Sequence, residues 1–139
     1  MKVLFALLCF LALTNQSRAM DDASMSKLLI GTWVCEGDQV VPDGKTHYTV
    51  ETAINGNGEF DSTWSYVLPA ATPGAAVAPP AVVRVQGEWE IRDSFMHVHV
   101  AQVTPSSYAP GFQDTSQQIH FLDKDSWQEE GSVRVYRRK

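Results

Sequence analysis

The chain has 139 residues, and its 16 Asp and Glu outnumber its 11 Lys and Arg, for a formal net charge of −5 at pH 7. An acidic chain is repelled by nucleic acid and by anionic membrane surfaces, so we expect neither as a partner. The length predicts one domain with its own hydrophobic core and leaves too few residues for a second.

The first nineteen residues are typical of an export signal. Lys2 supplies a positive charge, an apolar run of eleven residues follows, and the small residues Ser17 and Ala19 precede the expected cleavage point. The run is too short for a permanent membrane helix, which needs about 20 residues. We therefore expect a signal peptide over 1–19, a single mature domain over 20–139, and a periplasmic or secreted location without membrane insertion.

Cleavage would leave nine basic and sixteen acidic residues, a net charge of −7, and one cysteine, Cys35. One cysteine cannot form an internal disulfide, so the fold must be held by packing and hydrogen bonds. Two interpretations of Cys35 stay open at this point. It is either a small buried hydrophobe in the first strand or a reactive or intermolecular thiol.

Apolar and polar residues alternate with a period of two along the mature chain, which predicts β-strands. At most one helical turn, over 22–29, precedes the first strand, 31–37. Strands at 46–53 and 59–67 flank "INGNG", whose Asn and Gly residues tolerate positive φ and predict a hairpin. The Pro- and Ala-rich stretch 68–80 then predicts a long connection outside any regular strand ladder.

The clearest alternation lies in "AVVRVQGEWEIR", residues 81–92, which predicts a strand with one apolar and one charged face. Gly87 in its middle predicts a bulge or bend. Another strand is expected at 95–103, and a second long loop at 104–115. Three short strands complete the series: 117–122, 127–130 and 133–138.

About eight strands joined mostly by tight turns predict an all-β fold. An open sheet of this size would expose two long edges, which exported proteins avoid and which closure into a barrel removes. We therefore expect an antiparallel up-and-down β-barrel, with a two-sheet sandwich as the alternative.

The motif "GTW" at 31–33 opens the first strand, and "RVYRR" at 134–138 ends the last one. Together they resemble the calycin superfamily, which includes lipocalins, fatty-acid-binding proteins and avidins. The resemblance implies that Trp33 closes one end of the barrel under a basic side chain of the last strand. The candidates are Arg134, Arg137 and Arg138, with Arg138 preferred. A cation over an indole face contributes about 0.5–2 kcal/mol.

The pair Arg134 and Tyr136 is similar to the Arg-x-Tyr pair that holds the ligand carboxylate in fatty-acid-binding proteins. The two helices that follow the first strand in those proteins have no counterpart here, where only "DQVVPDGK" occupies their place. Bacterial exported lipocalin-like domains are the closest in pattern.

His97 and His99 share one face of a predicted strand, and His47 or His120 could add a third metal ligand. The alternative is an ordinary polar face with the apolar residues between the histidines packing inward. Which face is buried stays open, and we expect no metal.

Glu88 and Glu90 alternate with arginines, which is typical of a solvated sheet face rather than of an acid–base pair. The chain contains no nucleophile elbow and no phosphate-binding glycine loop. We therefore expect neither an enzyme nor a cofactor.

Aromatic residues are the better indication of function. Trp64 and Tyr66 share a face of the strand 59–67 with Phe60 and Ser62, where they either fill the core or line a cavity. We expect an exported lipocalin-like protein that binds a small apolar or amphipathic molecule in its barrel. The predicted ligand-binding residues are Arg134, Tyr136, Trp64 and Tyr66.

The alternative function is a periplasmic protein-binding module, such as a hydrolase inhibitor or an immunity protein. Its contacts would come from the acidic surface and from the loops at 68–80 and 104–115. Tyr108 and Phe112 in the second loop are the predicted partner contacts, because exposed aromatic residues on a rim suit binding.

Overall fold

The computed structural model describes residues 19–41, 44–67, 73–74 and 80–139. All but the last residue of the signal peptide predicted for 1–19, and most of the loop predicted for 68–80, therefore lie outside the described residues. One helix, eight strands and a short 3-10 helix, η1, follow one another: α1 (Asp22–Leu29), β1 (Gly31–Val41), β2 (Gly44–Ile54), β3 (Glu59–Val67), β4 (Ala81–Arg92), β5 (Phe95–Thr104), η1 (Ser106–Gly111), β6 (Thr115–Asp123), β7 (Ser126–Glu129) and β8 (Val135–Arg138).

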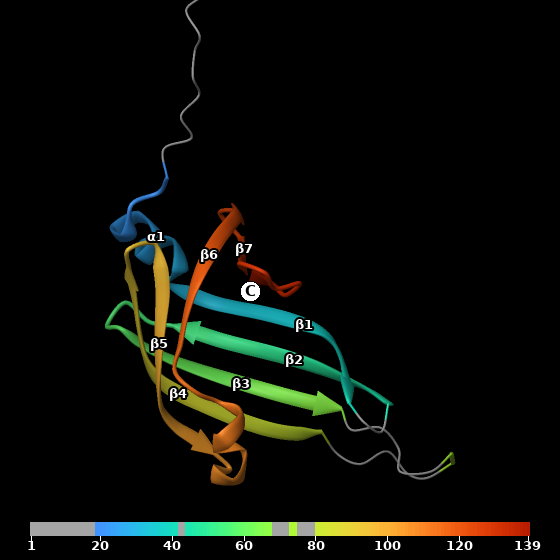
Figure 1. The fold of residues 1–139 in the computed structure, drawn as a ribbon. Coiled ribbons are helices and arrows are strands. Elements are labelled where there is room, and N and C mark those ends of the chain that lie inside the picture. Colours follow the sequence, from blue (N-terminus) through green and yellow to red (C-terminus); the bar gives the residue numbers. More distant parts are fainter. Residues whose placement is uncertain (1–18, 42–43, 68–72, 75–79) are drawn as a thin grey trace, which may run out of the picture.

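The eight strands form a closed antiparallel barrel in which each strand pairs with the next and β8 pairs with β1. Figure 1 labels strands β1 to β7 of this barrel. This confirms the predicted up-and-down barrel over the two-sheet sandwich. The same topology occurs in calycins but is not specific to them.

The wall of the barrel is taller on one side than on the other. Strands β1 to β5 have nine to twelve residues, whereas β7 and β8 have four each. The seam between β1 and β8 contains only two pairs, Trp33 with Arg138 and Val34 with Arg137. Closure is therefore confined to the end of the barrel at Trp33, which we call the closed end. The opposite end, where β1 ends and β2 begins, is the open end.

Helix α1 lies at the closed end and is longer than the single turn expected from the sequence. Asp21 caps it by accepting a hydrogen bond from the backbone N–H of Ser24 at 2.8 Å, and Met25 and Leu29 are buried one turn apart. The carboxylate of Asp22 also accepts the backbone N–H groups of residues 93 and 94 in the β4–β5 turn. The cap and this apolar pair explain the extra turn.

No helix in the described part of the chain has the length and apolar character needed to cross a membrane.

Gly87 marks a bulge, as predicted. The register between β4 and β5 shifts between Gln86 and Gly87, and a Cβ atom at position 87 would collide with the backbone carbonyl of His99. Only glycine permits this close approach of the two strands.

The last strand begins two residues later than the sequence predicts. Ser132 forms a turn in which its N–H donates to the carbonyl of Glu129 at 3.1 Å and its hydroxyl accepts the N–H of Arg134 at 3.0 Å. Val133 is almost fully exposed. Arg134 therefore belongs to the β7–β8 turn rather than to β8.

The guanidinium of Arg138 holds the closed end together. It lies 4.3 Å from the centroid of the Trp33 ring, and Trp33 is completely buried. Its Nη1 donates to the carbonyl of Ile30 at 3.1 Å and its Nη2 to the carbonyl of Leu28 at 2.8 Å, so it also satisfies the C-terminus of α1. The predicted contact between Trp33 and Arg138 is present.

The glycine of the Gly-x-Trp motif has a steric reason. Gly31 has a φ of +145°, and a Cβ atom there would lie 2.5 Å from Nη1 of Arg138. Trp33 donates its own Nε1–H to the carbonyl of Leu29 at 2.6 Å. The motif therefore joins α1, β1 and β8 at one point.

We predict that Arg138→Ala lowers the free energy of unfolding by about 2–4 kcal/mol, because it removes a cation–π contact and hydrogen bonds from a charged donor. Arg137→Ala is the matched control, since Arg137 is exposed on the same strand. We expect that control to stay within about 0.5 kcal/mol of the wild type. Urea denaturation measures both, and equal losses in the two variants would contradict this role of Arg138.

Candidate functional site: a cavity inside the barrel

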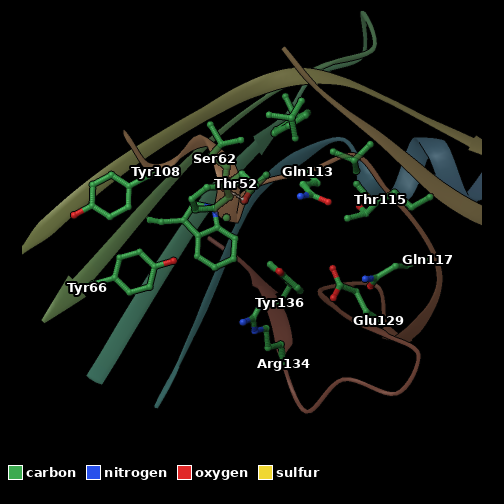
Figure 2. A pocket seen from close by; sticks show the side chains of 18 of the residues that line it. Thr52, Ser62, Tyr66, Tyr108, Gln113, Thr115, Gln117, Glu129, Arg134 and Tyr136 are labelled. Carbon is green, nitrogen blue, oxygen red and sulfur yellow. Dashed lines mark hydrogen bonds between the residues drawn. The ribbon is translucent and has the colours of Figure 1, made fainter. Parts of the chain in front are cut away.

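The barrel encloses a cavity of about 900 Å³ that reaches from the core to the open end (Figure 2). Inward-facing side chains of all eight strands and of η1 contribute to its lining. Ligand pockets of proteins typically measure about 300–1,000 Å³, so the cavity has room for a small organic molecule.

One wall of the cavity is apolar. Met96, Val98 and Val100 of β5 line it together with Ile54 and Phe60. The sequence did not decide which face of β5 is buried. The apolar residues point into the cavity, so His97 and His99, which alternate with them, lie on the outer face.

The four predicted ligand-binding residues come together in this cavity: Arg134, Tyr136, Trp64 and Tyr66 all line it. Figure 2 shows Arg134 and Tyr136 on one side and Tyr66 across from them. The stacked rings of Trp64 and Tyr66 have centroids 6.3 Å apart.

Arg134 is held against aromatic faces. Its guanidinium carbon lies 5.1 Å from the ring centroid of Tyr48 and 5.4 Å from that of Trp64. Its Nε donates to the Tyr48 hydroxyl at 3.2 Å. Burial opposes the charge, but the hydrogen bond to Tyr48 and the surrounding ionisable groups outweigh it and raise the pKa of Arg134. The cavity therefore contains a permanent positive charge.

A row of aromatic rings connects the cavity to the closed end. Tyr136 stacks on Trp127 with centroids 4.1 Å apart, and Trp127 meets Trp33 edge to face at 6.2 Å. Burial, with a smaller contribution from the nearby Glu129, raises the pKa of Tyr136, so its phenol stays protonated at neutral pH. Trp33, the ring under Arg138, is thus connected through Trp127 to Tyr136 in the cavity lining.

Glu129 is a cavity residue that the sequence analysis missed. Burial raises the pKa of its carboxyl group, and the nearby Arg134 offsets only part of this shift. The alternation in "WQEE" predicts this position, because Glu129 lies two residues after Trp127 and so shares its inward face.

Tyr108 and Phe112 differ in position, although the sequence suggested the same role for both. The loop predicted at 104–115 contains η1, and Tyr108 on η1 is 42% exposed. Phe112 follows η1 and is half-buried. Its ring packs edge to face on Trp64, with the two ring centroids 5.4 Å apart. Both line the cavity. Phe112 is therefore less exposed than the sequence suggests, and its role in binding stays a prediction.

Three of the four histidines, His47, His99 and His120, form separate pairs with acidic residues on the surface. Nδ1 of His99 lies 2.8 Å from a carboxylate oxygen of Asp114, whose other oxygen accepts the N–H of Val100. His47 pairs with Asp38 and His120 with Glu130. Within the described ranges no three His, Cys, Asp or Glu side chains lie close enough to hold a metal ion.

The remaining candidates lie away from the cavity lining. Glu88 and Glu90 are exposed on β4, and Glu90 pairs with Arg92 at 3.2 Å. Cys35 is 2% exposed in β1, and burial raises the pKa of its thiol. This position confirms the first interpretation of Cys35, a small buried side chain in the first strand.

A comparison of the chain with models of protein families finds no match, and a comparison with curated proteins finds no match either.

We predict that Glu129→Gln stabilises the protein increasingly as the pH rises. The raised pKa means that ionised Glu129 is less favourable in the folded than in the unfolded chain, where its pKa is near 4.5. The contribution of Glu129 to the unfolding free energy should therefore fall as the pH rises from below 4.5 through the raised pKa, and Gln removes this loss.

Glu88→Gln, on the outer face of β4, is the control for that measurement, and we expect it to keep the pH dependence of the wild type. Chemical denaturation at a series of pH values measures all three proteins. A constant difference between Glu129→Gln and the wild type at every pH would contradict the burial of this carboxylate.

Proposed function

We propose that this protein is an exported, calycin-like barrel that binds a small amphipathic molecule inside its cavity. Arg134 and Tyr136 contact the polar end of the ligand, and Trp64 and Tyr66 contact its apolar body. The observation that carries the proposal is a cavity of about 900 Å³ with a charged guanidinium on its wall. The predicted signal peptide is the support for a periplasmic or secreted location.

The position of Arg134 favours a ligand over a purely structural role. Arg138, not Arg134, covers Trp33, so closure of the barrel does not require Arg134. The Nε of Arg134 donates to the Tyr48 hydroxyl, and Tyr136 is a second hydroxyl that interacts with the guanidinium. A partly buried guanidinium on a cavity wall is suited to bind an acceptor that enters the cavity.

The apolar wall and the aromatic residues suit the body of such a ligand. A flat group placed beside Trp64 would contact Phe112 and Tyr66 and face the aliphatic side chains of β5. Pockets for small molecules combine an apolar lining with a few placed polar groups, which is the composition found here.

The alternative, a protein-binding module that acts as a hydrolase inhibitor or an immunity protein, stays a prediction. Exposed Tyr108 on η1 and the net negative charge favour it. Phe112 favours it less, because its ring packs on Trp64 and is only partly exposed.

We predict that Arg134→Ala weakens binding of naphthalene-2-carboxamide, a small amphipathic probe, by about ten- to a hundredfold. This range corresponds to the loss of one hydrogen bond from a charged donor, about 1.5–3 kcal/mol. Quenching of tryptophan fluorescence measures the affinity, and thermal unfolding shows that the variant is folded.

Arg84→Ala is the matched control for this binding test, because Arg84 pairs with Asp61 on the outer face of the barrel. We expect it to bind the probe like the wild type. No binding by the wild type, or equal binding by all three proteins, would argue against the cavity as the binding site.

A further inference from the structure

Two polar groups on the cavity wall, Trp127 and Glu129, have no hydrogen-bond partner among the residues that the structure describes. Trp127 is 3% exposed and lines the cavity, and its buried Nε1–H has no acceptor among the described residues. Buried donors in folded proteins are nearly always paired, so an unpaired one on a cavity wall points to an acceptor that arrives from outside.

Glu129 is the second such group. Its side chain lines the cavity and makes no hydrogen bond with the residues that the structure describes, and Arg134 is the charged residue that acts on it. A carboxyl group in this position is satisfied by a hydrogen-bond donor on a bound molecule. Burial raises the pKa of Glu129, because the protein supplies too few hydrogen bonds to offset the loss of water around the carboxylate.

The fold places these groups side by side. Trp127 and Glu129 are two residues apart in β7 and so share a face. Gln128 pairs with Val135, so Glu129 and Arg134 lie opposite each other at the β7–β8 turn. Figure 2 shows Glu129, Arg134 and Tyr136 on the same side of the cavity. We call this group, Trp127, Glu129 and Arg134, the polar wall.

The polar wall offers two donors and one acceptor. Arg134 and Trp127 donate, and Glu129 accepts when it is ionised. A ligand with only a carboxylate would satisfy the donors but would bring a second negative charge next to Glu129. Like charges in a partly buried site oppose each other, so such a ligand must also force a proton onto Glu129.

We propose that the polar wall selects an uncharged ligand group that both accepts and donates hydrogen bonds, an amide-type group, in preference to a simple carboxylate. The carbonyl oxygen of this group accepts from Arg134 and Trp127, and its N–H donates to Glu129. The inference rests on the proposed function of the cavity and adds the class of its ligand.

A matched series of probes tests the selection: naphthalene-2-carboxamide, naphthalene-2-carboxylate and 2-naphthylmethylammonium, which share one aromatic body and differ in the polar group. At pH 7.5 we expect the carboxamide to bind at least about tenfold more tightly than either charged probe, since the carboxylate faces Glu129 and the ammonium faces Arg134. Isothermal titration calorimetry measures the three dissociation constants.

The variant Glu129→Gln separates the contribution of this residue. We expect its affinity for the carboxylate to rise at least about tenfold, because the opposing charge is gone. Its affinity for the carboxamide should change by less than about threefold, because the Gln carbonyl still accepts. Glu88→Gln on the outer face is the control and should bind all three probes like the wild type.

The indole N–H resonance of Trp127 gives an independent readout. We expect it to move downfield when the carboxamide binds and to stay in place with naphthalene, which has no acceptor. Its assignment comes from Trp127→Phe.

The outcomes separate the two proposals. A carboxylate that binds tightest to the wild type, with no effect of Glu129→Gln, would overturn the selection by the polar wall and leave the binding cavity in place. Failure of all three probes to bind would overturn both.

Discussion

The fold depends on the contact between one guanidinium and one indole at the closed end. Arg138 covers Trp33 and donates to the carbonyl groups of Leu28 and Ile30, so the last strand, the first strand and the C-terminus of α1 meet there. Only two residue pairs join β1 to β8, so few backbone hydrogen bonds hold this seam. The contact of Arg138 with Trp33 adds the stabilisation that a longer strand pairing would otherwise give. Gly31 is part of the same constraint, because any side chain there would displace Arg138.

Confining closure to one end leaves the other end free to hold a cavity. The strands β7 and β8 are short, and the turn between them carries Arg134 into the barrel instead of extending the wall. Trp127 connects the two regions, since it touches Trp33 on one side and Tyr136 on the other. The same aromatic packing that stabilises the closed end thus positions the polar groups proposed to bind the ligand.

The periodicity of the sequence predicted the barrel, the 59–67 hairpin strand and the bulge at Gly87, because each depends on local alternation or on one residue type. It also placed Trp64 and Tyr66 on the face that lines the cavity. The second turn of α1, the inward ring of Phe112 and the start of β8 were missed, because they depend on contacts between distant segments. Glu129 was not considered as a cavity residue, although alternation from Trp127 places it on the inward face. Whether the barrel is filled or hollow depends on how side chains pack together, and no local pattern contains that information.

The central claim is that the cavity holds a small molecule, and native mass spectrometry of the protein purified gently from its own compartment tests it most directly. The account predicts a stoichiometric adduct of a few hundred daltons, as a cavity of this size allows, on the wild type and a smaller bound fraction on Arg134→Ala. A bare protein in both preparations, or an adduct with the mass of another polypeptide, would contradict it.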